Sequence, residues 1–206
     1  MNKQRILVTG ANGFIGKNLL IRLGEQADIE TLAFVRGDSV EALMGLVARA
    51  DAVIHLAGEN RPNDVADFTR NNVDLTSALC DAIQSSGRNI PLIFTSSAQA
   101  QHDNPYGQSK LVAEQVIEAF VAKTDNSAII YRFVGVFGKF CKPNYNSVVA
   151  TFCHNIARGL PIQISDPDFM LELAYIDDVV DGLLQALKTA KSGLVRREVS
   201  QTYSIT

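Results

Sequence analysis

The sequence predicts an α/β fold built on a doubly wound parallel sheet, followed by a small C-terminal lobe. Short β-rich apolar runs alternate with amphipathic helical segments through the first two thirds of the 206 residues. The runs are apolar throughout instead of alternating with polar residues, which is typical of strands covered by helices on both faces. A glycine-rich turn joins the first run to the first helix, and this arrangement is typical of Rossmann-type sheets.

The expected elements follow in order. Strands are predicted at residues 5–9, 31–35, 52–57, 91–96 and 127–133, and helices at 17–26, 40–50, 75–86 and 106–123. After residue 138 the texture becomes polar and turn-rich, with further helices at 147–159 and 174–190. We therefore expect a cofactor-binding domain at 1–138 and part of a substrate-binding lobe at 139–206.

Composition excludes several classes of function. The chain is 47% hydrophobic, its formal charge is −3, and its Lys and Arg residues are scattered, so neither nucleic acid nor an anionic membrane is an expected partner. It has no signal-like start and no membrane-length apolar run, so a cytoplasmic location is expected. The three cysteines, Cys80, Cys141 and Cys153, lack the spacing of a disulfide framework or a metal site, and we expect no metal. Cys141 lies between Lys139 and Lys142, yet an inert thiol is the preferred interpretation.

The glycine turn predicts a dinucleotide site. Gly10, Gly13 and Gly16 are spaced so that backbone amides and a helix N-terminus can surround a pyrophosphate. Other cofactor contacts are expected from the same turn and from the end of the third predicted strand: Asn12, Phe14, Ile15, Leu56, Ala57 and Gly58.

Cofactor choice depends on the end of the second strand. An acidic residue there accepts hydrogen bonds from the ribose hydroxyls of NAD, whereas an arginine pairs with the extra phosphate of NADP. Arg36 occupies this position and favours NADP(H). Asp38, two residues on, leaves NAD(H) open.

A catalytic group is predicted at the fourth strand and the helix after it. Tyr106 and Lys110 are four residues apart, so they share one helical face, where the ammonium of Lys110 is expected to lower the pKa of the phenol and to bind the cofactor ribose. Ser97 is expected to orient the reacting oxygen, and Ser96 to support the cofactor side. For Asn72, a substrate contact and a helix cap are equally open interpretations.

These motifs together resemble the extended short-chain dehydrogenases/reductases, the NAD-dependent epimerase/dehydratase family, that act on nucleotide sugars. The resemblance extends over nearly the whole chain through TGANGFIG, DAVIHLAG, NNV, FTSS, YGQSK and AYIDDV. Within that family, IHLAGENRP, SSAQAQHDNPYGQSK and FGKFCKPNYNSVVATFCHNIARG are similar to the N-terminal reductase domains of the capsular polysaccharide enzyme F group and its O-antigen relatives.

The resemblance implies reduction by NADPH of the C4 ketone of a UDP-linked 4-keto-6-deoxy N-acetylhexosamine, in the making of UDP-N-acetyl-L-fucosamine for capsule or O-antigen. It also implies a homodimer, and a C-terminal cupin domain that these residues do not include. TYSIT, at 202–206, is expected to be the strand before the rest of a truncated lobe.

Some positions depart from the family pattern. Between Arg36 and Asp51 there is room for one helix only, so the usual third strand is expected to be absent. Gly135 stands where the family commonly has an asparagine that touches the sugar nucleotide, and Leu171 stands near the place of a diphosphate-binding arginine. Substrate contacts are therefore expected from a loop that could instead be simply exposed, with Lys142, Asn144 and Asn146 as the candidates.

Two other functions stay open. An epimerase or dehydratase would recycle a tightly bound NAD, but Ala98 and Gln99 stand where a dehydratase carries an acidic pair. A non-catalytic cofactor-binding module is the other alternative, and the retained Tyr106 and Lys110 pair argues against it.

Overall fold

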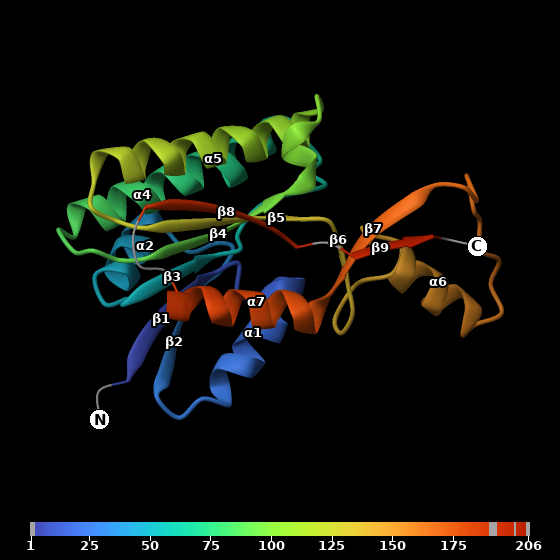
Figure 1. Cartoon of the computed structure of the whole chain (residues 1–206), viewed down its shortest axis with the longest axis horizontal. Helices are drawn as coiled ribbons and strands as arrows, with labels where there is room; N and C mark the ends of the chain where they lie inside the picture. The colour runs from blue at the N-terminus through green and yellow to red at the C-terminus, as the bar shows by residue number, and fades with distance from the viewer. Residues whose placement is uncertain (1–2, 190–192, 200, 205–206) are drawn as a thin grey trace.

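The computed structural model describes residues 3–189, 193–199 and 201–204 and contains one main sheet and one small sheet (Figure 1). The main sheet has the order β2-β1-β3-β4-β5-β8, and all of its pairings are parallel. Its strands are β1 (Gln4–Thr9), β2 (Ile29–Phe34), β3 (Ala52–His55), β4 (Leu92–Ser97), β5 (Ala128–Phe133) and β8 (Leu194–Val199).

Helices cover both faces of this sheet, as Figure 1 shows. One face carries α1 (Phe14–Gly24) and α7 (Ile176–Thr189), and the other carries α2 (Val40–Val47), α4 (Leu75–Ser85) and α5 (Pro105–Lys123). The middle of β1 shows why the strands of this sheet contain continuous apolar runs. Ile6 and Val8 pack with the first pair of helices, Leu7 packs with the other three, and all three residues are fully buried. The predicted doubly wound fold is confirmed.

The sheet ends at β2, with no strand beyond it among the described residues. Between Phe34 and Ala52 the chain forms only α2, and it then returns past β1 to form β3. The absence of the usual third strand, predicted from the short Arg36 to Asp51 segment, therefore holds in the structure.

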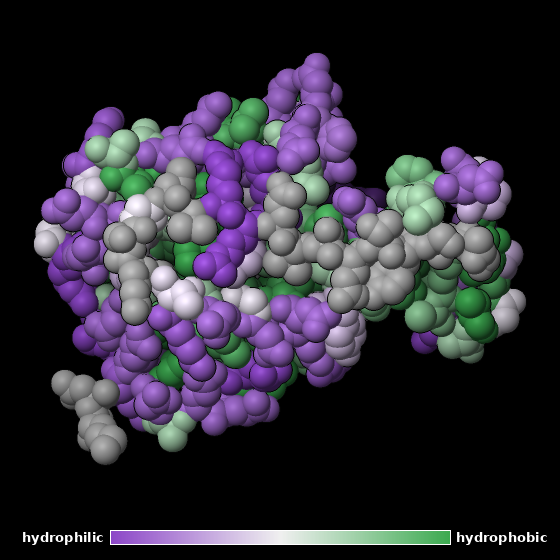
Figure 2. Space-filling model, viewed as in Figure 1, coloured by the Kyte–Doolittle hydropathy of each residue, from purple (hydrophilic) through white to green (hydrophobic). Residues whose placement is uncertain are grey.

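The lobe projects from the carboxyl ends of the main strands. It contains β6 (Gly135–Phe137), α6 (Val148–Ile156), β7 (Met170–Tyr175) and β9 (Gln201–Ser204), with β7 parallel to β6 and antiparallel to β9. The expected strand at 202–206 is thus seen as β9, although residues 205–206 lie outside the described part. Hydrophobic side chains are exposed on this lobe, including Ile156 and Phe169 (Figure 2).

Residues 139–206 do not all belong to the lobe. Helix α7 packs against α1, and β8 pairs with β5 at the edge of the main sheet. The simple division at residues 138 and 139 therefore needs correction, because the chain crosses from the main sheet to the lobe, returns, and enters the lobe again at β9. The apolar stripe of α7 drives this return, since Val179, Val180 and Leu183 are buried in the main core.

Three short helical segments complete the chain: α3 (Ala66–Phe68), a π-helix at Thr69–Asp74, and a 3-10 turn at Ala98–Gln101. The last two lie beside the functional cleft described next.

Candidate active site

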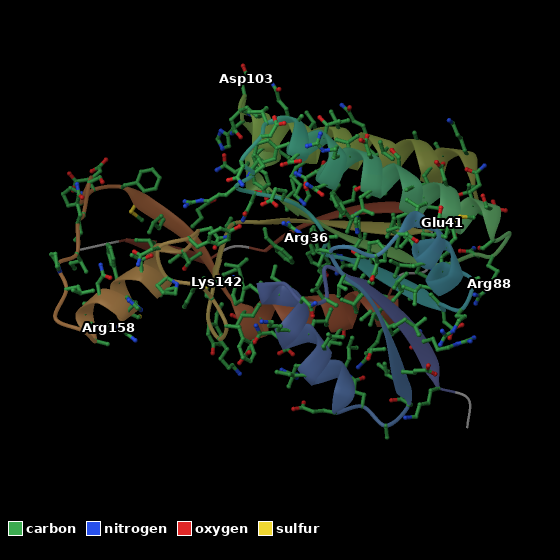
Figure 3. The ribbon with its side chains drawn as sticks, turned by 180° about the vertical axis from the view of Figure 1, so that it is seen from behind. Arg36, Glu41, Arg88, Asp103, Lys142 and Arg158 are labelled. Atoms are coloured by element: carbon green, nitrogen blue, oxygen red, sulfur yellow. The ribbon has the colours of Figure 1, made fainter. Side chains whose placement is uncertain are left out.

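A cleft of about 1890 Å³ lies between the carboxyl ends of the main strands and the lobe. It opens where the strand order reverses, between β1 and β3, the usual ligand position in such sheets. Its volume exceeds the roughly 300–1,000 Å³ of a typical small-ligand pocket, so it has room for a dinucleotide and a second ligand. Figure 3 shows Arg36 on the main-sheet side and Lys142 on the lobe side.

The cleft brings together all but one of the residues predicted for the site. Its lining includes Gly10, Asn12, Gly13, Phe14, Ile15, Gly16, Arg36, Leu56, Ala57, Gly58, Ser96, Ser97, Tyr106, Lys110, Lys142, Asn144 and Asn146. Only Asn72 does not line it.

The glycine turn forms one end of the cleft. Gly10 has φ +67°, and a Cβ on Gly16 would stand 2.5 Å from the carbonyl oxygen of Gly10, so only glycine lets α1 start this close to β1. No side chain caps the start of α1 at Gly13, and its first turn has no acidic residue. The unpaired amides and the positive end of the helix dipole therefore face the cleft and fit a pyrophosphate.

Ser97 and Tyr106 meet because the 3-10 turn packs directly on the start of α5. A Cβ on Gly107 would stand 2.1 Å from the carbonyl oxygen of Gln99, so a larger residue would push the two segments apart. The helix is started by Asn104, whose Oδ1 accepts the Gly107 N–H at 2.8 Å. Burial raises the pKa of Tyr106, a side-chain hydrogen bond with Ser97 lowers it, and the net pKa is raised. The phenol is therefore protonated at neutral pH.

The net pKa shift of Tyr106 is upward, opposite to the direction expected from Lys110, because burial of the phenol is the largest cause of the shift. The Nζ of Lys110 donates to the Thr95 carbonyl oxygen at 3.0 Å and lies 5.0 Å from the centre of the Phe94 ring. Burial lowers the pKa of Lys110 to about 8, against the opposing effect of Glu114. Lys110 remains charged at pH 7.

Behind Lys110 lies a buried carboxylate that the sequence did not single out. Glu114 is one helical turn beyond Lys110 and is fully buried. Its Oε1 accepts hydrogen bonds from Ser96 Oγ at 2.5 Å and Arg132 Nε at 2.9 Å. Arg196 of β8 also pairs with it. The Ser96 hydroxyl is thus held by Glu114, although Ser96 still lines the cleft as predicted.

A buried hydrogen-bond chain crosses beneath the cleft through His55. The Ala57 N–H donates to Thr9 Oγ1 at 3.1 Å, and Thr9 Oγ1 lies 2.6 Å from His55 Nδ1. On the other side, Thr76 donates to the Asn72 carbonyl oxygen at 2.6 Å and so accepts from His55 Nε2 at 3.0 Å. Burial lowers the pKa of His55 to about 3, with a smaller effect of Lys110. The imidazole is therefore neutral, and its single proton is on Nε2.

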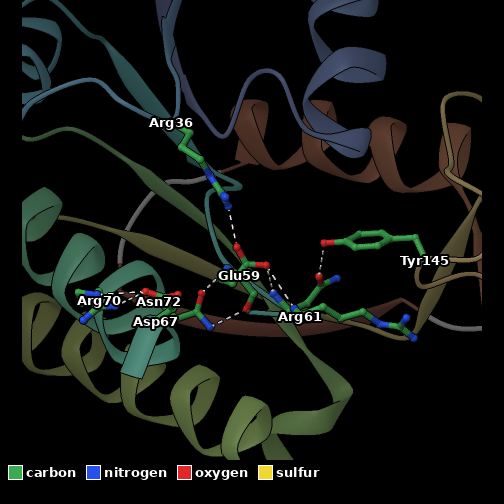
Figure 4. Close-up of polar contacts among 8 residues, drawn as sticks. Arg36, Glu59, Arg61, Asp67, Arg70, Asn72 and Tyr145 are labelled. Atoms are coloured by element: carbon green, nitrogen blue, oxygen red, sulfur yellow. Dashed lines mark hydrogen bonds and ion pairs between the residues drawn. The ribbon is translucent and has the colours of Figure 1, made fainter. Parts of the chain in front are cut away.

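Asn72 lies behind the cleft and makes neither of the contacts expected for it. It sits inside the π-helix, not at a helix cap, and is 1% exposed. Its amide accepts from the Glu59 N–H at 2.7 Å and donates to the Glu59 carbonyl oxygen at 3.0 Å and to Ser109 Oγ at 2.8 Å. All three bonds of the side chain are internal, and Figure 4 shows the two to Glu59, so Asn72 positions the segment after β3.

The loop of the lobe forms a wall of the cleft, and its residues Lys142, Asn144 and Asn146 are exposed. Asn144 is anchored to α6, where its N–H donates to Thr151 Oγ1 at 2.9 Å. Tyr145 reaches across to the segment after β3: its hydroxyl donates to Asn60 Oδ1 at 3.1 Å, and the guanidinium of Arg61 lies 5.7 Å from its ring centre. Figure 4 shows Tyr145 approaching the segment after β3, which carries Glu59, from the side of the lobe.

Sequence reasoning missed Tyr145, Arg61 and Glu59, which all line the cleft. Tyr145 stood within the loop already selected, between Asn144 and Asn146. Gly135 and Leu171, noted for departing from the family pattern, also line the cleft, from β6 and β7.

The described residues contain neither a metal-binding cluster nor a membrane-spanning helix. In the described part of the chain, no three His, Cys, Asp or Glu residues are grouped so as to hold a metal ion. Among the same residues, no helix combines the length and the apolar character that crossing a bilayer requires.

Known proteins share this arrangement. The chain is 46% identical over 201 residues to UDP-2-acetamido-2,6-beta-L-arabino-hexul-4-ose reductase of Pseudomonas aeruginosa, covering 98% of this chain and 54% of that protein. A crystal structure of the capsular polysaccharide assembling protein CapF from Staphylococcus aureus matches with a TM-score of 0.84 at 35% identity, over 98% of this chain and 55% of that one. UDP-glucuronic acid 4-epimerase from Bacillus cereus, solved with NAD, has a TM-score of 0.87 at 21% identity over 98% of this chain and 80% of that one, which shows a shared fold.

The chain thus spans about half the length of the first two proteins, 54% and 55%. The family described as NAD dependent epimerase/dehydratase matches residues 6–201. This match covers nearly the whole chain and agrees with the glycine turn, the Ser97 and Tyr106 pair and the cleft at the sheet edge. The chain belongs to the NAD dependent epimerase/dehydratase family.

Proposed function

We propose that this chain is the reductase part of an enzyme that uses NADPH to reduce the C4 ketone of a UDP-linked 4-keto-6-deoxy N-acetylhexosamine. The observation that carries the proposal is the protonated phenol of Tyr106, hydrogen-bonded to Ser97 in a cleft that starts at the glycine turn. The name of the 46% identical relative, a reductase of a UDP-linked acetamido hexulose, supports this substrate class.

Different residues of the cleft bind the cofactor, orient the ketone and donate the proton. The glycine turn and the start of α1 hold the pyrophosphate of the cofactor, which supplies a hydride when bound. Ser97 donates a hydrogen bond to the ketone oxygen and orients it beside Tyr106. Tyr106 gives its phenolic proton to that oxygen as the alkoxide forms, and the charged ammonium of Lys110 stabilises the phenolate that remains.

The cofactor-binding and substrate-binding parts keep their proposed roles. Residues 1–138 with α7 and β8 hold the cofactor, and the lobe, with Lys142, Asn144 and Asn146, holds the sugar nucleotide. A homodimer and a cupin domain in the whole protein belong to the same proposal. The mass of the native protein in solution and the gene sequence following the codon for Thr206 test these two points.

Ketone reduction is tested by mixing purified protein, NADPH and the keto sugar nucleotide and following NADPH absorbance. We expect oxidation that Tyr106→Phe slows by roughly 10²–10⁴-fold, the usual size of a general-acid contribution. Tyr175→Phe is the matched control, because Tyr175 does not line the cleft, and it should retain the wild-type rate. Full activity in Tyr106→Phe would contradict the assignment of the proton donor.

The same preparation tests the rival function. An epimerase or dehydratase of this fold would retain NAD through purification and would convert its substrate without net NADPH oxidation. Analysis of nucleotide released by denaturing the protein distinguishes the two. Finding stoichiometric NAD and no NADPH consumption would favour the epimerase or dehydratase over the reductase. A chain that binds cofactor but converts no sugar nucleotide would indicate a binding module.

A further inference from the structure

The predicted phosphate-binding arginine meets a carboxylate inside the cleft. Arg36 follows β2, and its Nη2 donates to Glu59 Oε2 at 2.7 Å, across the carboxyl edge of the sheet from the segment after β3 (Figure 4). The side chain of Arg36 is 80% exposed, whereas that of Glu59 is 11% exposed. The carboxylate is therefore the fixed member of the pair and the guanidinium the movable one.

Neighbouring groups hold Glu59 in place. Its Oε1 accepts the N–H groups of Asn60 at 3.1 Å and Arg61 at 3.2 Å, and its own backbone is bonded in both directions by the amide of Asn72. Burial raises the pKa of Glu59, but the hydrogen bonds from Arg36, Arg61 and Asn60 outweigh burial and leave the pKa lowered. Glu59 therefore presents a permanent negative charge in the cleft at neutral pH.

The acidic residue next to Arg36 in the sequence is placed differently. Asp38 Oδ2 accepts the Val35 N–H at 2.8 Å, so this carboxylate closes the turn after β2. Arg36 donates instead to Glu59. Both carboxylates line the cleft, but the one that pairs with Arg36 comes from the segment after β3 and not from the turn after β2.

We propose that Glu59 is a specificity-determining residue that limits the preference of this cleft for NADPH over NADH. Its carboxylate competes with the 2′-phosphate of NADPH for Arg36 and repels that dianion, whereas the ribose hydroxyls of NADH can donate to it. Arg36 and Glu59 thus act as opposed determinants of cofactor choice. The inference rests on the proposed use of a nicotinamide dinucleotide by this chain but not on the identity of the sugar.

The test is equilibrium titration with NADPH and with NADH, followed by the fluorescence of the reduced nicotinamide. In Glu59→Gln we expect the ratio of the NADH to the NADPH dissociation constant to rise by about 5- to 20-fold, mainly through tighter NADPH binding, because one charged contact has this size. Asp181→Asn is the matched control: it removes one negative charge from another arginine pair, with Arg22 on the helix face, and should leave the ratio unchanged. The ratio is internal to each protein, so a fraction of unfolded chain affects both constants equally.

A second variant and a double mutant complete the design. Glu59→Ala should raise the ratio in the same direction as Glu59→Gln. Arg36→Ala should lower it by about 10-fold or more, and Glu59→Gln should have a smaller effect in the Arg36→Ala background, because part of its effect acts through competition for the guanidinium.

A ratio that stays within twofold of wild type in both Glu59 variants, or that falls, would overturn the inference; a fall would mean that Glu59 holds Arg36 ready for the phosphate. The outcome is separate from that of the reductase test. Wild-type protein that binds both cofactors without reducing the keto sugar would refute the reductase activity and leave the role of Glu59 standing.

Discussion

Lys110 combines a buried position with a charge that its surroundings only partly compensate. Its ammonium is held by one carbonyl oxygen and one aromatic face, and Glu114, whose charge opposes the effect of burial, is engaged by arginines. Burial therefore lowers the pKa of Lys110 from 10.5 to about 8. A lysine with this pKa is charged at neutral pH but loses its proton in mildly alkaline solution.

This shift predicts the alkaline limit of the reaction. Stabilising the Tyr106 phenolate requires the charged form of Lys110, so kcat/KM for ketone reduction should fall as the pH rises through about 8. The measurement is a pH profile from 6 to 10 at fixed ionic strength. Lys110→Arg keeps its charge over this range, so its profile should lack the fall even if its rate is lower. A fall of the same position in both proteins would assign the limit to another group.

The π-helix at Thr69–Asp74 carries the buried amide of Asn72. Asn72 connects the segment after β3 with α5, through Glu59 on one side and Ser109 on the other. π-helical turns are rare and are frequent at functional sites. In this protein the turn fixes the backbone of Glu59.

Removing the Asn72 amide should therefore lower the stability of the folded chain. Asn72→Ala leaves the N–H and carbonyl oxygen of Glu59 without their buried partner, and we expect a loss of about 2–4 kcal/mol in the free energy of unfolding. Urea denaturation measures the loss. Asn63→Ala, at an exposed site in the preceding segment, should stay within about 0.5 kcal/mol of wild type. A loss below about 1 kcal/mol in Asn72→Ala would show that water replaces the amide at little cost.

At the scale of the whole molecule, the sequence predicted what depends on local pattern. The first five strands of the main sheet, the glycine turn and the spacing of Tyr106 and Lys110 follow from residues that are near one another in the chain, whereas β8 was not predicted. The pairing of Arg36 with Glu59, and of Tyr145 with Asn60 85 residues away, depends on which strands become neighbours, and no local pattern encodes it. The helical segment RNNVDLT gave no sign of its π-helical turn for the same reason.

The lobe was the least predictable part. Strand β6 is only three residues long, and β7 ends in the residues Ala174–Tyr175 that were assigned to the following helix. These strands are stabilised by each other and by β9 across long stretches of chain. Strand β8 lies at the edge of the main sheet, where Arg196 and Arg197 are exposed, so it lacks the continuous apolar run that marks the other strands.

Besides the backbone pairing of β8 with β5, a buried carboxylate links this returning strand to the main sheet. Glu114 of α5 accepts from Ser96 of β4, pairs with Arg132 of β5 at 2.7 Å, and pairs with Arg196 of β8. Burial raises the pKa of Glu114, but the bonds from Arg132, Ser96 and Arg196 outweigh it, and the pKa is lowered from 4.5. The negative charge therefore stabilises the folded chain.

Glu114→Gln should cost about 3 kcal/mol of unfolding free energy, because it leaves arginines beside a buried site without their shared carboxylate. Arg196→Ala should cost less, about 1 kcal/mol, because that side chain is 41% exposed and its ion pairs are screened by water.

The pH dependence of stability gives a second test of the role of Glu114. A lowered carboxyl pKa contributes stability that is present above about pH 4.5 and is lost as the pH falls through the folded value, so wild type should lose stability in acid more steeply than Glu114→Gln. Urea titrations at pH 7 and at pH 4 measure both effects, and equal acid sensitivity in the two proteins would show that Glu114 does not link β8 to the main sheet through its charge.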